Sequence, residues 1–150
     1  MSYAAGISAS TIAIGIEVSI SSEGFLKIEN AIASVDCGLA VNPEIVEDQI
    51  AGGMIFGISN ALHGEITLKD GQVEQSNFHD YPLLKLKDSP KIRVYIADSA
   101  DTHPNGIGEG AVPVVIAALV DAIANAGGPR IRKLPILNTN GRLNTYPSPS

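Results

Sequence analysis

Apolar and polar residues alternate most regularly near the start of the chain. Isoleucine or valine occupies every second position from 12 to 20, with small or polar residues between them. A period of two is typical of a strand with one buried face. Residues 21–24 have the composition of a turn, and residues 25–35 predict a second strand that pairs back on the first.

A helix is predicted to begin at residue 43. Asn42 suits the N-cap and Pro43 the first helical position, and acidic residues at 44, 47 and 48 lie near the positive end of the helix dipole. We expect this helix to extend to about residue 62, because Gly64 follows it as a stop signal.

One face of this helix carries small residues. Gly53, Gly57 and Ala61 recur every four positions, and Gly52 adds a further glycine. Glycine costs about 1 kcal/mol relative to alanine inside a helix. The glycines therefore predict the close approach of either another backbone or a ligand.

The segment after this helix predicts further strands. Residues 65–69 and 72–75 flank the pair Asp70-Gly71, which favours a two-residue type I′ hairpin turn. Isoleucine and valine alternate with charged residues and a tyrosine from 91 to 96, which indicates another strand. Residues 130–136 predict a last strand.

A second helix is predicted over residues 111–126, with glycines and a proline at 127–129 as its stop. Asp121 is the only charged residue between Gly110 and Asn125, and a helix that is apolar nearly all round is buried. We therefore predict one α+β domain over residues 1–137, a mixed sheet of β-hairpins with two long helices packed on it. Residues 138–150 are expected to form a flexible tail.

The charge balance narrows the possible partners. Ten Lys and Arg residues against sixteen Asp and Glu residues leave a net charge of −6. An acidic chain of this kind lacks the basic surface that binds a phosphate backbone, so we expect no nucleic-acid partner. Charged residues make up 17% of the chain, below the average of about 25%, which indicates that another surface covers part of this domain.

The single cysteine and the N-terminal segment limit the cell compartment and the kind of site. Cys37 excludes an internal disulfide and any multi-cysteine metal site within this chain, and its apolar surroundings predict an inert thiol. The N-terminus lacks the basic region of a secretory signal, and its charge-free stretch is too short to span a bilayer. We expect a soluble domain that is cytoplasmic by default.

The segment 106–110, GIGEG, is the first candidate for chemistry. Its glycines permit a close approach of a ligand to the backbone, and the helix that follows offers free amide groups. Glu109 has two interpretations. It offsets the helix dipole, or it is a general base whose pKa the neighbouring apolar helix raises by desolvation.

Gln49 is the second candidate. It lies one helical turn before Gly53, on the same side of the first helix. Its default role is that of a solvated surface amide. The functional alternative is an amide that hydrogen-bonds a heteroaromatic ligand lying over the glycines.

Three separate motifs resemble one family, the molybdenum-binding subunits of the xanthine dehydrogenase and aldehyde oxidase family. The order and spacing of the motifs fit this family, and the middle motif resembles its isoquinoline 1-oxidoreductase-like branch. The resemblance covers roughly residues 12 to 136. The motifs are VDCG at 35–38 with VNP at 41–43 and QIAGG at 49–53, SNFHDYPLL at 76–84, and GIGEG at 106–110 with RIRKLP at 130–135.

The resemblance implies a chemistry and a site. In this family a molybdenum centre on a pterin hydroxylates an electron-poor carbon of an aldehyde or N-heteroaromatic substrate, with water as the oxygen source. A glutamate acts as the general base, and Glu109 matches it. The implied cofactor contacts are those of Gln49 and Gly53 and the backbone groups of Gly106, Ile107 and Gly108.

The resemblance also implies partners. Family subunits are several times longer than this chain, so most cofactor contacts would lie in a missing upstream part. The implied cofactor is molybdenum–molybdopterin in its cytosine dinucleotide form, shared with that part, while iron–sulfur clusters belong to a small partner subunit. We expect the isolated chain to be inactive and to self-associate. The alternative is a non-catalytic α+β assembly module or a remnant fragment.

Overall fold

The computed structural model describes residues 2–5 and 10–144 of the chain. Four strands form one mixed sheet in the order β1-β2-β3-β6. β1 pairs with β2 and β2 with β3 in antiparallel fashion, and β6 lies parallel to β3 at the sheet edge. The strands are β1 (Ser2–Ala5), β2 (Thr11–Ile20), β3 (Leu26–Asp36) and β6 (Lys91–Ile96).

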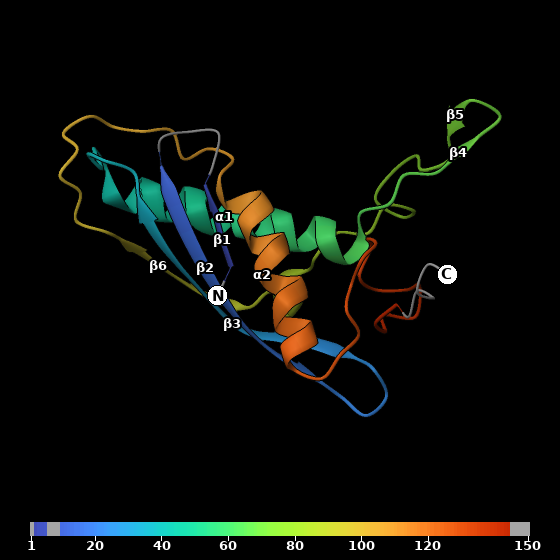
Figure 1. The fold of residues 1–150 in the computed structure, drawn as a ribbon. Coiled ribbons are helices and arrows are strands. Elements are labelled where there is room, and N and C mark those ends of the chain that lie inside the picture. Colours follow the sequence, from blue (N-terminus) through green and yellow to red (C-terminus); the bar gives the residue numbers. More distant parts are fainter. Residues whose placement is uncertain (1, 6–9, 145–150) are drawn as a thin grey trace.

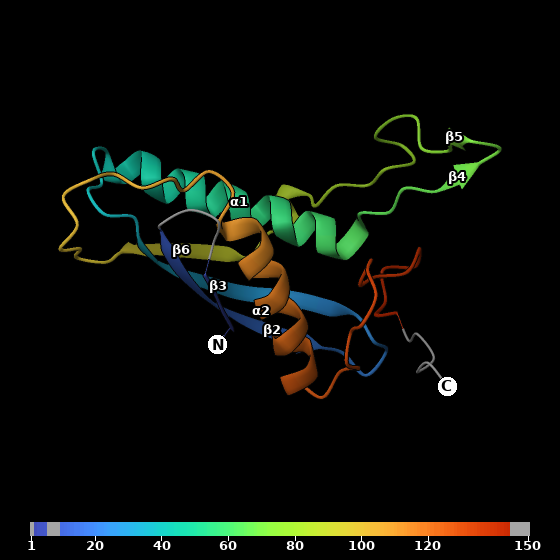
Figure 2. The ribbon, with the colours of Figure 1, turned by 45° about the horizontal axis from the view of Figure 1, so that its top comes forward.

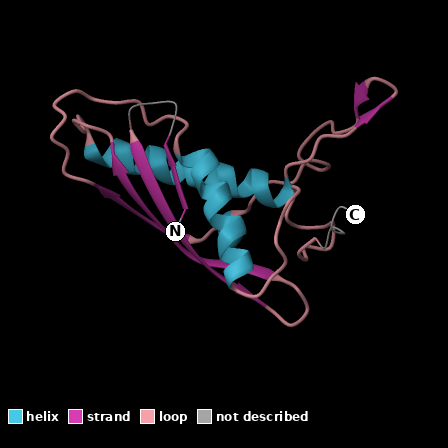
Figure 3. Ribbon diagram, viewed as in Figure 1, coloured by secondary structure: helices cyan, strands magenta, loops and turns pink. Residues whose placement is uncertain are grey.

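Two helices lie on one face of this sheet. α1 (Pro43–His63) contacts β6 and α2 (Ala111–Asn125) contacts β1 and β2, and the two helices cross each other (Figures 1 and 3). This arrangement confirms the predicted α+β class, the mixed sheet and the long β2–β3 hairpin. β1 adds an edge strand that we did not predict.

The sheet buries one face only. Ala31, Ala33 and Val35 of β3 point to the helices and are buried, whereas Ile32 and Ser34 between them are exposed. Alternation of this kind is what a half-covered sheet requires.

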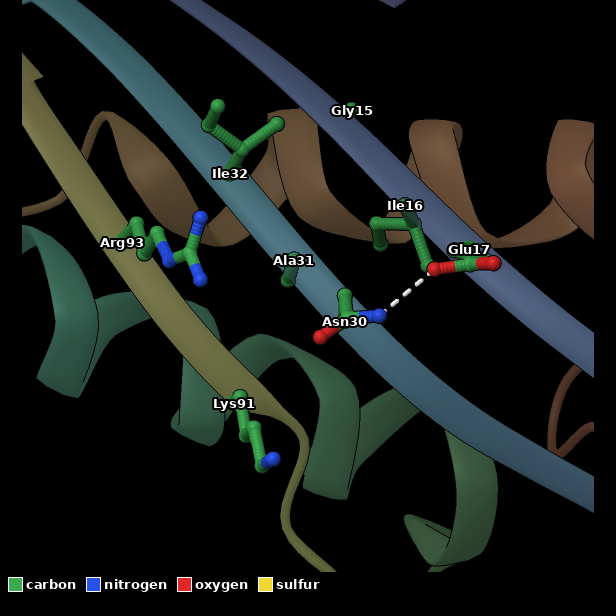
Figure 4. Close-up of a pocket in the computed structure, with 8 residues that line it drawn as sticks. All are labelled: Gly15, Ile16, Glu17, Asn30, Ala31, Ile32, Lys91 and Arg93. Carbon is green, nitrogen blue, oxygen red and sulfur yellow. Dashed lines mark hydrogen bonds between the residues drawn. The ribbon is translucent and has the colours of Figure 1, made fainter.

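A depression lies on the uncovered face of the sheet and is lined by eight residues (Figure 4). Among them are Glu17 and Asn30, whose side chains are joined by a hydrogen bond of 2.6 Å.

Local signals determine where α1 begins and ends. The side-chain oxygen of Asn42 accepts a hydrogen bond from the backbone N–H of Ile45 at 3.3 Å, as expected of an N-cap. The N–H of Gly64 donates to the carbonyl of Asn60 at 2.9 Å and closes the last turn. Both predicted helix boundaries are confirmed within one residue.

The small-residue face of α1 packs against α2. A Cβ atom at Gly53 would lie 3.2 Å from Cβ of Ala111, and one at Gly57 would lie 2.8 Å from the carbonyl oxygen of Val112. The glycines therefore serve the close approach of another backbone, which was one of the two predicted explanations. This face is used inside the domain and is not left open for a partner.

α2 is largely buried, as its composition predicted. Its exposed residues are Pro113, Ala117, Asp121 and Asn125, which recur every four positions and form a single stripe. The stripe holds no large apolar side chain. α2 therefore leaves no broad apolar surface for a partner, because Val114, Val115, Leu119 and Ile123 are buried in the core and Ile116 and Val120 pack partly against it.

A narrow arm, residues 64–83, extends from the C-terminal end of α1 away from the sheet and helices (Figures 1 and 2). It carries the short strands β4 (Leu68–Lys69) and β5 (Gln72–Val73). Asp70 and Gly71 between them both have positive φ angles, 51° and 78°. This geometry confirms the predicted type I′ turn.

The C-terminal segment differs from the prediction. Residues 130–136 form no strand, because the N–H groups of Ile136 and Leu137 donate instead to the carbonyls of Ala61 and Leu62 at the end of α1. Leu143, which we expected in a flexible tail, is buried and its N–H donates to the carbonyl of Gly24. Residues 145–150 of the expected tail lie outside the described residues.

Within the part of the chain that the structure describes, neither helix has the length and apolar character needed to cross a membrane. The short 3-10 helix η1 (Leu86–Asp88) precedes β6.

Candidate functional site

The candidate site lies where β3 and β6 end. The long loop from residue 97 to 110 leaves β6, passes the end of β3 and leads into α2 (Figure 1). α1 runs beside this loop, so residues of the loop and of the first half of α1 come together. The two candidates, Gln49 and Glu109, belong to these two elements.

The first half of the loop is fastened to the end of β3. The N–H of Leu39 donates to the carbonyl of His103 at 3.1 Å, and the N–H of Asn105 donates to the carbonyl of Cys37 at 2.8 Å. Gly38 lies between these bonds with a φ angle of 68°, and a Cβ atom there would collide with the carbonyl oxygen of His103. This position therefore requires glycine.

Asp101 braces the same part of the loop. Its carboxylate accepts hydrogen bonds from the N–H of His103 at 2.9 Å and from Nδ2 of Asn105 at 3.2 Å. The bond from the N–H of His103, followed by that from Asn105, lowers the pKa of Asp101. We did not single out Asp101 or Gly38. The available signal is an aspartate in a loop that also contains proline, asparagine and glycine, where Asp side chains commonly bond the backbone two residues on in an Asx turn.

Glu109 lies on the surface directly before α2. Its side chain is exposed, and its carbonyl accepts a hydrogen bond from the N–H of Val112 at 3.1 Å, which starts the helix. In this chain by itself, the apolar helix therefore does not cover the Glu109 side chain. α2 turns its apolar side chains to the sheet and α1, away from Glu109.

Gln49 contacts the Glu109 loop directly. Its Nε2 donates to the carbonyl oxygen of Gly108 at 3.0 Å, across 59 positions of sequence. Gln49 is exposed, as the default interpretation of a surface amide requires, and it also makes a hydrogen bond to the loop. Because Nε2 faces Gly108, Oε1 is the end of the amide that is available to a ligand.

The other predicted contacts divide into two groups. Gly106 and Gly108 are exposed, and a Cβ atom at Gly108 would meet no atom within 4 Å, so a ligand has access to the backbone there. Gly53 packs on α2, and Ile107 is partly buried against the core. Within this chain Gly53 serves the contact between the helices, and Ile107 anchors the loop to the core.

These residues fit a molybdenum–pterin group. The resemblance implies a metal carried on a pterin, a group that the protein would hold mainly through hydrogen bonds. Among the described residues, no cluster of three or more His, Cys, Asp or Glu is suited to a metal ion. The site offers an open backbone at Gly108 and the Oε1 of Gln49. The hydroxyl of Ser10, directly before β2 at this end of the sheet, is buried and has no hydrogen-bond partner.

Other candidate chemistry finds less support. Cys37 is 2% exposed, which agrees with the predicted inert thiol. The depression on the uncovered face of the sheet contains none of the predicted site residues (Figure 4).

Comparison with known proteins gives a family match. The family model described as the molybdopterin cofactor-binding domain matches residues 3–90 of this chain. The matched region includes the glycine face of α1, Gln49 and the arm. Glu109 and its loop lie outside the matched range.

Individual relatives extend the similarity further along the chain. The isoquinoline 1-oxidoreductase subunit beta of Brevundimonas diminuta is 34% identical over 115 residues, which is 77% of this chain and 15% of that protein. The aldehyde oxidoreductase molybdenum-binding subunit of Escherichia coli is 30% identical over 129 residues, 81% of this chain and 18% of that protein. The chain thus spans less than a fifth of the length of these relatives.

A solved structure shares the fold. The crystal structure of quinoline 2-oxidoreductase from Pseudomonas putida 86 aligns with a TM-score of 0.73 and 28% sequence identity. The alignment covers 85% of this chain and 17% of that one.

Proposed function

The chain belongs to the molybdopterin cofactor-binding domain family, as a portion of a molybdenum-binding subunit, and from this premise we propose that it forms the catalytic C-terminal part of a molybdenum hydroxylase. One observation carries the proposal. The amide of Gln49 is joined to the carbonyl of Gly108, next to Glu109, so two candidate residues from distant parts of the sequence share one site.

In the proposed enzyme each residue has a separate task. When bound, the molybdenum–pterin group supplies oxidation of an aldehyde or N-heteroaromatic carbon with water as the oxygen source. Glu109 accepts the proton from the attacking oxygen, as a general base held directly before α2. Gln49 accepts a hydrogen bond from the pterin through Oε1, and the backbone at Gly106 and Gly108 lets the group approach closely.

The proposal includes partners that supply what this chain lacks. Since the chain spans 15% of its isoquinoline 1-oxidoreductase relative, the remaining part of the subunit would complete the pocket and bury the exposed Glu109. We propose the cytosine dinucleotide form of the cofactor, and a small iron–sulfur subunit that takes the electrons. The substrate is a small molecule.

The substitution Glu109→Gln tests the catalytic role in the assembled enzyme. It keeps the shape of the side chain and removes the proton acceptor. The rate at which substrate reduces the molybdenum centre, measured by rapid mixing, should fall by about 10²- to 10⁴-fold. The molybdenum content of the variant, measured in the same samples, should be unchanged.

Glu44→Gln provides the matched control, because Glu44 is also an exposed glutamate at the start of a helix. If Glu109 only offsets the helix dipole, both substitutions should cost about 0.3–1 kcal/mol of stability and leave the reduction rate unchanged. That result would favour the alternative, a non-catalytic assembly module.

The isolated chain gives a second test of the shared site. Because it supplies only part of the proposed pocket, we expect it to purify without stoichiometric molybdenum. One tightly bound metal–pterin per chain, found by elemental analysis, would contradict the proposed dependence on an upstream part.

A further inference from the structure

The contact between Gln49 and the Glu109 loop has a consequence beyond cofactor binding. We propose that Gln49 is a positioning residue: its amide holds the backbone at Gly108, and through it Glu109, in place before any cofactor binds. The inference rests on the proposed role of Glu109 as the base. In this role Gln49 orders the loop in the chain without cofactor, through its bond to Gly108.

The loop needs such a hold in its middle. Its first half is fastened to β3 through His103 and Asn105, and its end is fixed where the N–H of Val112 bonds to the carbonyl of Glu109. Gly106 and Gly108 lie between these points and are exposed. Ile107 between the two glycines packs partly against the core, but Gly108 has no side chain of its own to pack. Since glycine has the greatest backbone freedom to lose, the bond from Gln49 adds order to the exposed backbone at Gly108.

The packing of the helices places Gln49 within reach of the loop. Gln49, Gly53 and Gly57 form one row along α1, since successive members are four positions apart. Gly53 meets Ala111 and Gly57 meets Val112, so this row follows the first turn of α2 at close range. The loop that leads into α2 therefore passes directly beside Gln49, where a side chain of this length reaches its backbone.

The chemistry of the contact requires a donor at position 49. Gly108 contributes a carbonyl oxygen, which only accepts hydrogen bonds. Glutamine satisfies it through Nε2. Leucine offers no donor, and an ionised glutamate would place a negative oxygen against the carbonyl. A protonated glutamic acid, in contrast, donates through its O–H.

The first experiment measures backbone order in the full 150-residue chain without cofactor. We expect the N–H order parameters of Gly108 and Glu109 to lie near about 0.85 in the unchanged chain and below about 0.6 in Gln49→Leu. Glu47→Leu, at a neighbouring exposed position of α1, should leave both values unchanged. Equal order parameters in Gln49→Leu and the unchanged chain would overturn the proposal.

The second experiment uses the pH dependence of Gln49→Glu. The order of Gly108 should be lost at pH 7 and recovered in acid, because the protonated side chain again donates to the carbonyl. Since the carbonyl oxygen disfavours the ionised form, the midpoint should lie at or above the usual glutamate pKa of about 4.3. The unchanged chain should show no such transition. A loop whose order in Gln49→Glu does not vary with pH would also overturn the proposal.

These measurements separate the two proposals. They involve neither metal nor turnover, so a Glu109→Gln enzyme with normal rates would overturn the catalytic role and leave the loop result standing. Conversely, a slow Glu109→Gln enzyme together with an ordered loop in Gln49→Leu would retain the base and reject Gln49 as its positioning residue.

Discussion

The body of the domain and its arm are built on different principles. In the body, the sheet and the two helices bury apolar side chains between them, among them Ile14 of β2, Ile58 of α1 and Leu119 of α2, each 0% exposed. In the arm, Leu68 and Phe78 are 70% and 77% exposed. Burial of apolar side chains stabilises the body, whereas the arm buries too few of them to be stabilised in the same way.

Hydrogen bonds between polar groups hold the arm. Gln75 accepts from the N–H of Thr67 at 2.8 Å and donates to its hydroxyl at 2.9 Å, and the N–H of Glu74 donates to the carbonyl of Thr67. Asp80 binds the backbone of Ser76 and Asn77. The exposed apolar side chains of the arm therefore contribute little to its own fold, and such a surface is typical of contact with another chain.

The largest effect should come from filling the contact between the helices of the body. In Gly57→Leu the new side chain would meet the backbone of Val112, only 2.8 Å from the position of its Cβ. We expect a loss of roughly 4 kcal/mol or more in the free energy of unfolding, measured by urea denaturation. Gly52→Leu is the matched control, because Gly52 is exposed with no atom within 4 Å of a Cβ, and it should be neutral or stabilising by up to about 1 kcal/mol. Similar losses in both variants would contradict close packing at Gly57.

Truncating one apolar side chain in each region compares them directly. Ile58→Ala in the body should cost about 2–5 kcal/mol of unfolding free energy, because Ile58 is fully buried. Leu68→Ala in the arm should change it by less than about 0.5 kcal/mol. Thermal or urea unfolding of both variants gives the two numbers. A loss above 2 kcal/mol for Leu68→Ala would show that the arm packs on the body in solution.

Features that depend on neighbours in the sequence could be predicted. Asn42 and Pro43 determine where α1 begins, and Asp70 and Gly71 determine the hairpin turn of the arm. The alternation of apolar and small or polar residues predicts β2. Each of these signals acts within a few residues. The fold class and most element boundaries followed from them.

Features that depend on distant contacts could not be predicted. A glycine such as Gly53 indicates that something approaches closely, but only the fold shows that α2 is the neighbour. The bond between Gln49 and Gly108 joins residues 59 positions apart. Leu143 entered the core by the same kind of contact, with the β2–β3 turn. For the site, the sequence thus indicated Gln49 and Glu109, but not the contact that links them.

The exposed side chains of the arm should lead to self-association of the free chain. Leu68 and Val73 face each other across the hairpin, so Leu68→Lys with Val73→Glu replaces an apolar pair by an oppositely charged one and keeps the turn. We expect the dissociation constant from sedimentation to rise at least about tenfold. Leu86→Lys, at a 92% exposed position outside the arm, is the control. A chain that stays monomeric at high concentration, or a control that has the same effect, would contradict this.

The smallest effect concerns the turn at the base of the arm, and it depends on pH. The N–H of Asn77, followed by the N–H and hydroxyl of Ser76, lowers the pKa of Asp80 to about 2. Because the folded pKa is lowered, the stabilising bonds are complete above the unfolded pKa of about 3.9 and are lost as the pH falls towards 2.

The amide signals of Ser76 and Asn77 report this loss by NMR. They should titrate with a midpoint near pH 2, while those of Ile14 and Ile58 in the body stay unchanged through the same transition. In Asp80→Asn the titration should disappear and the arm amides should exchange faster at neutral pH, with the body amides as the internal reference. A midpoint near pH 4 would mean that the turn is open in solution. Simultaneous changes in Ile14 and Ile58 would mean that arm and body unfold together, and the distinction between the two regions would then fail.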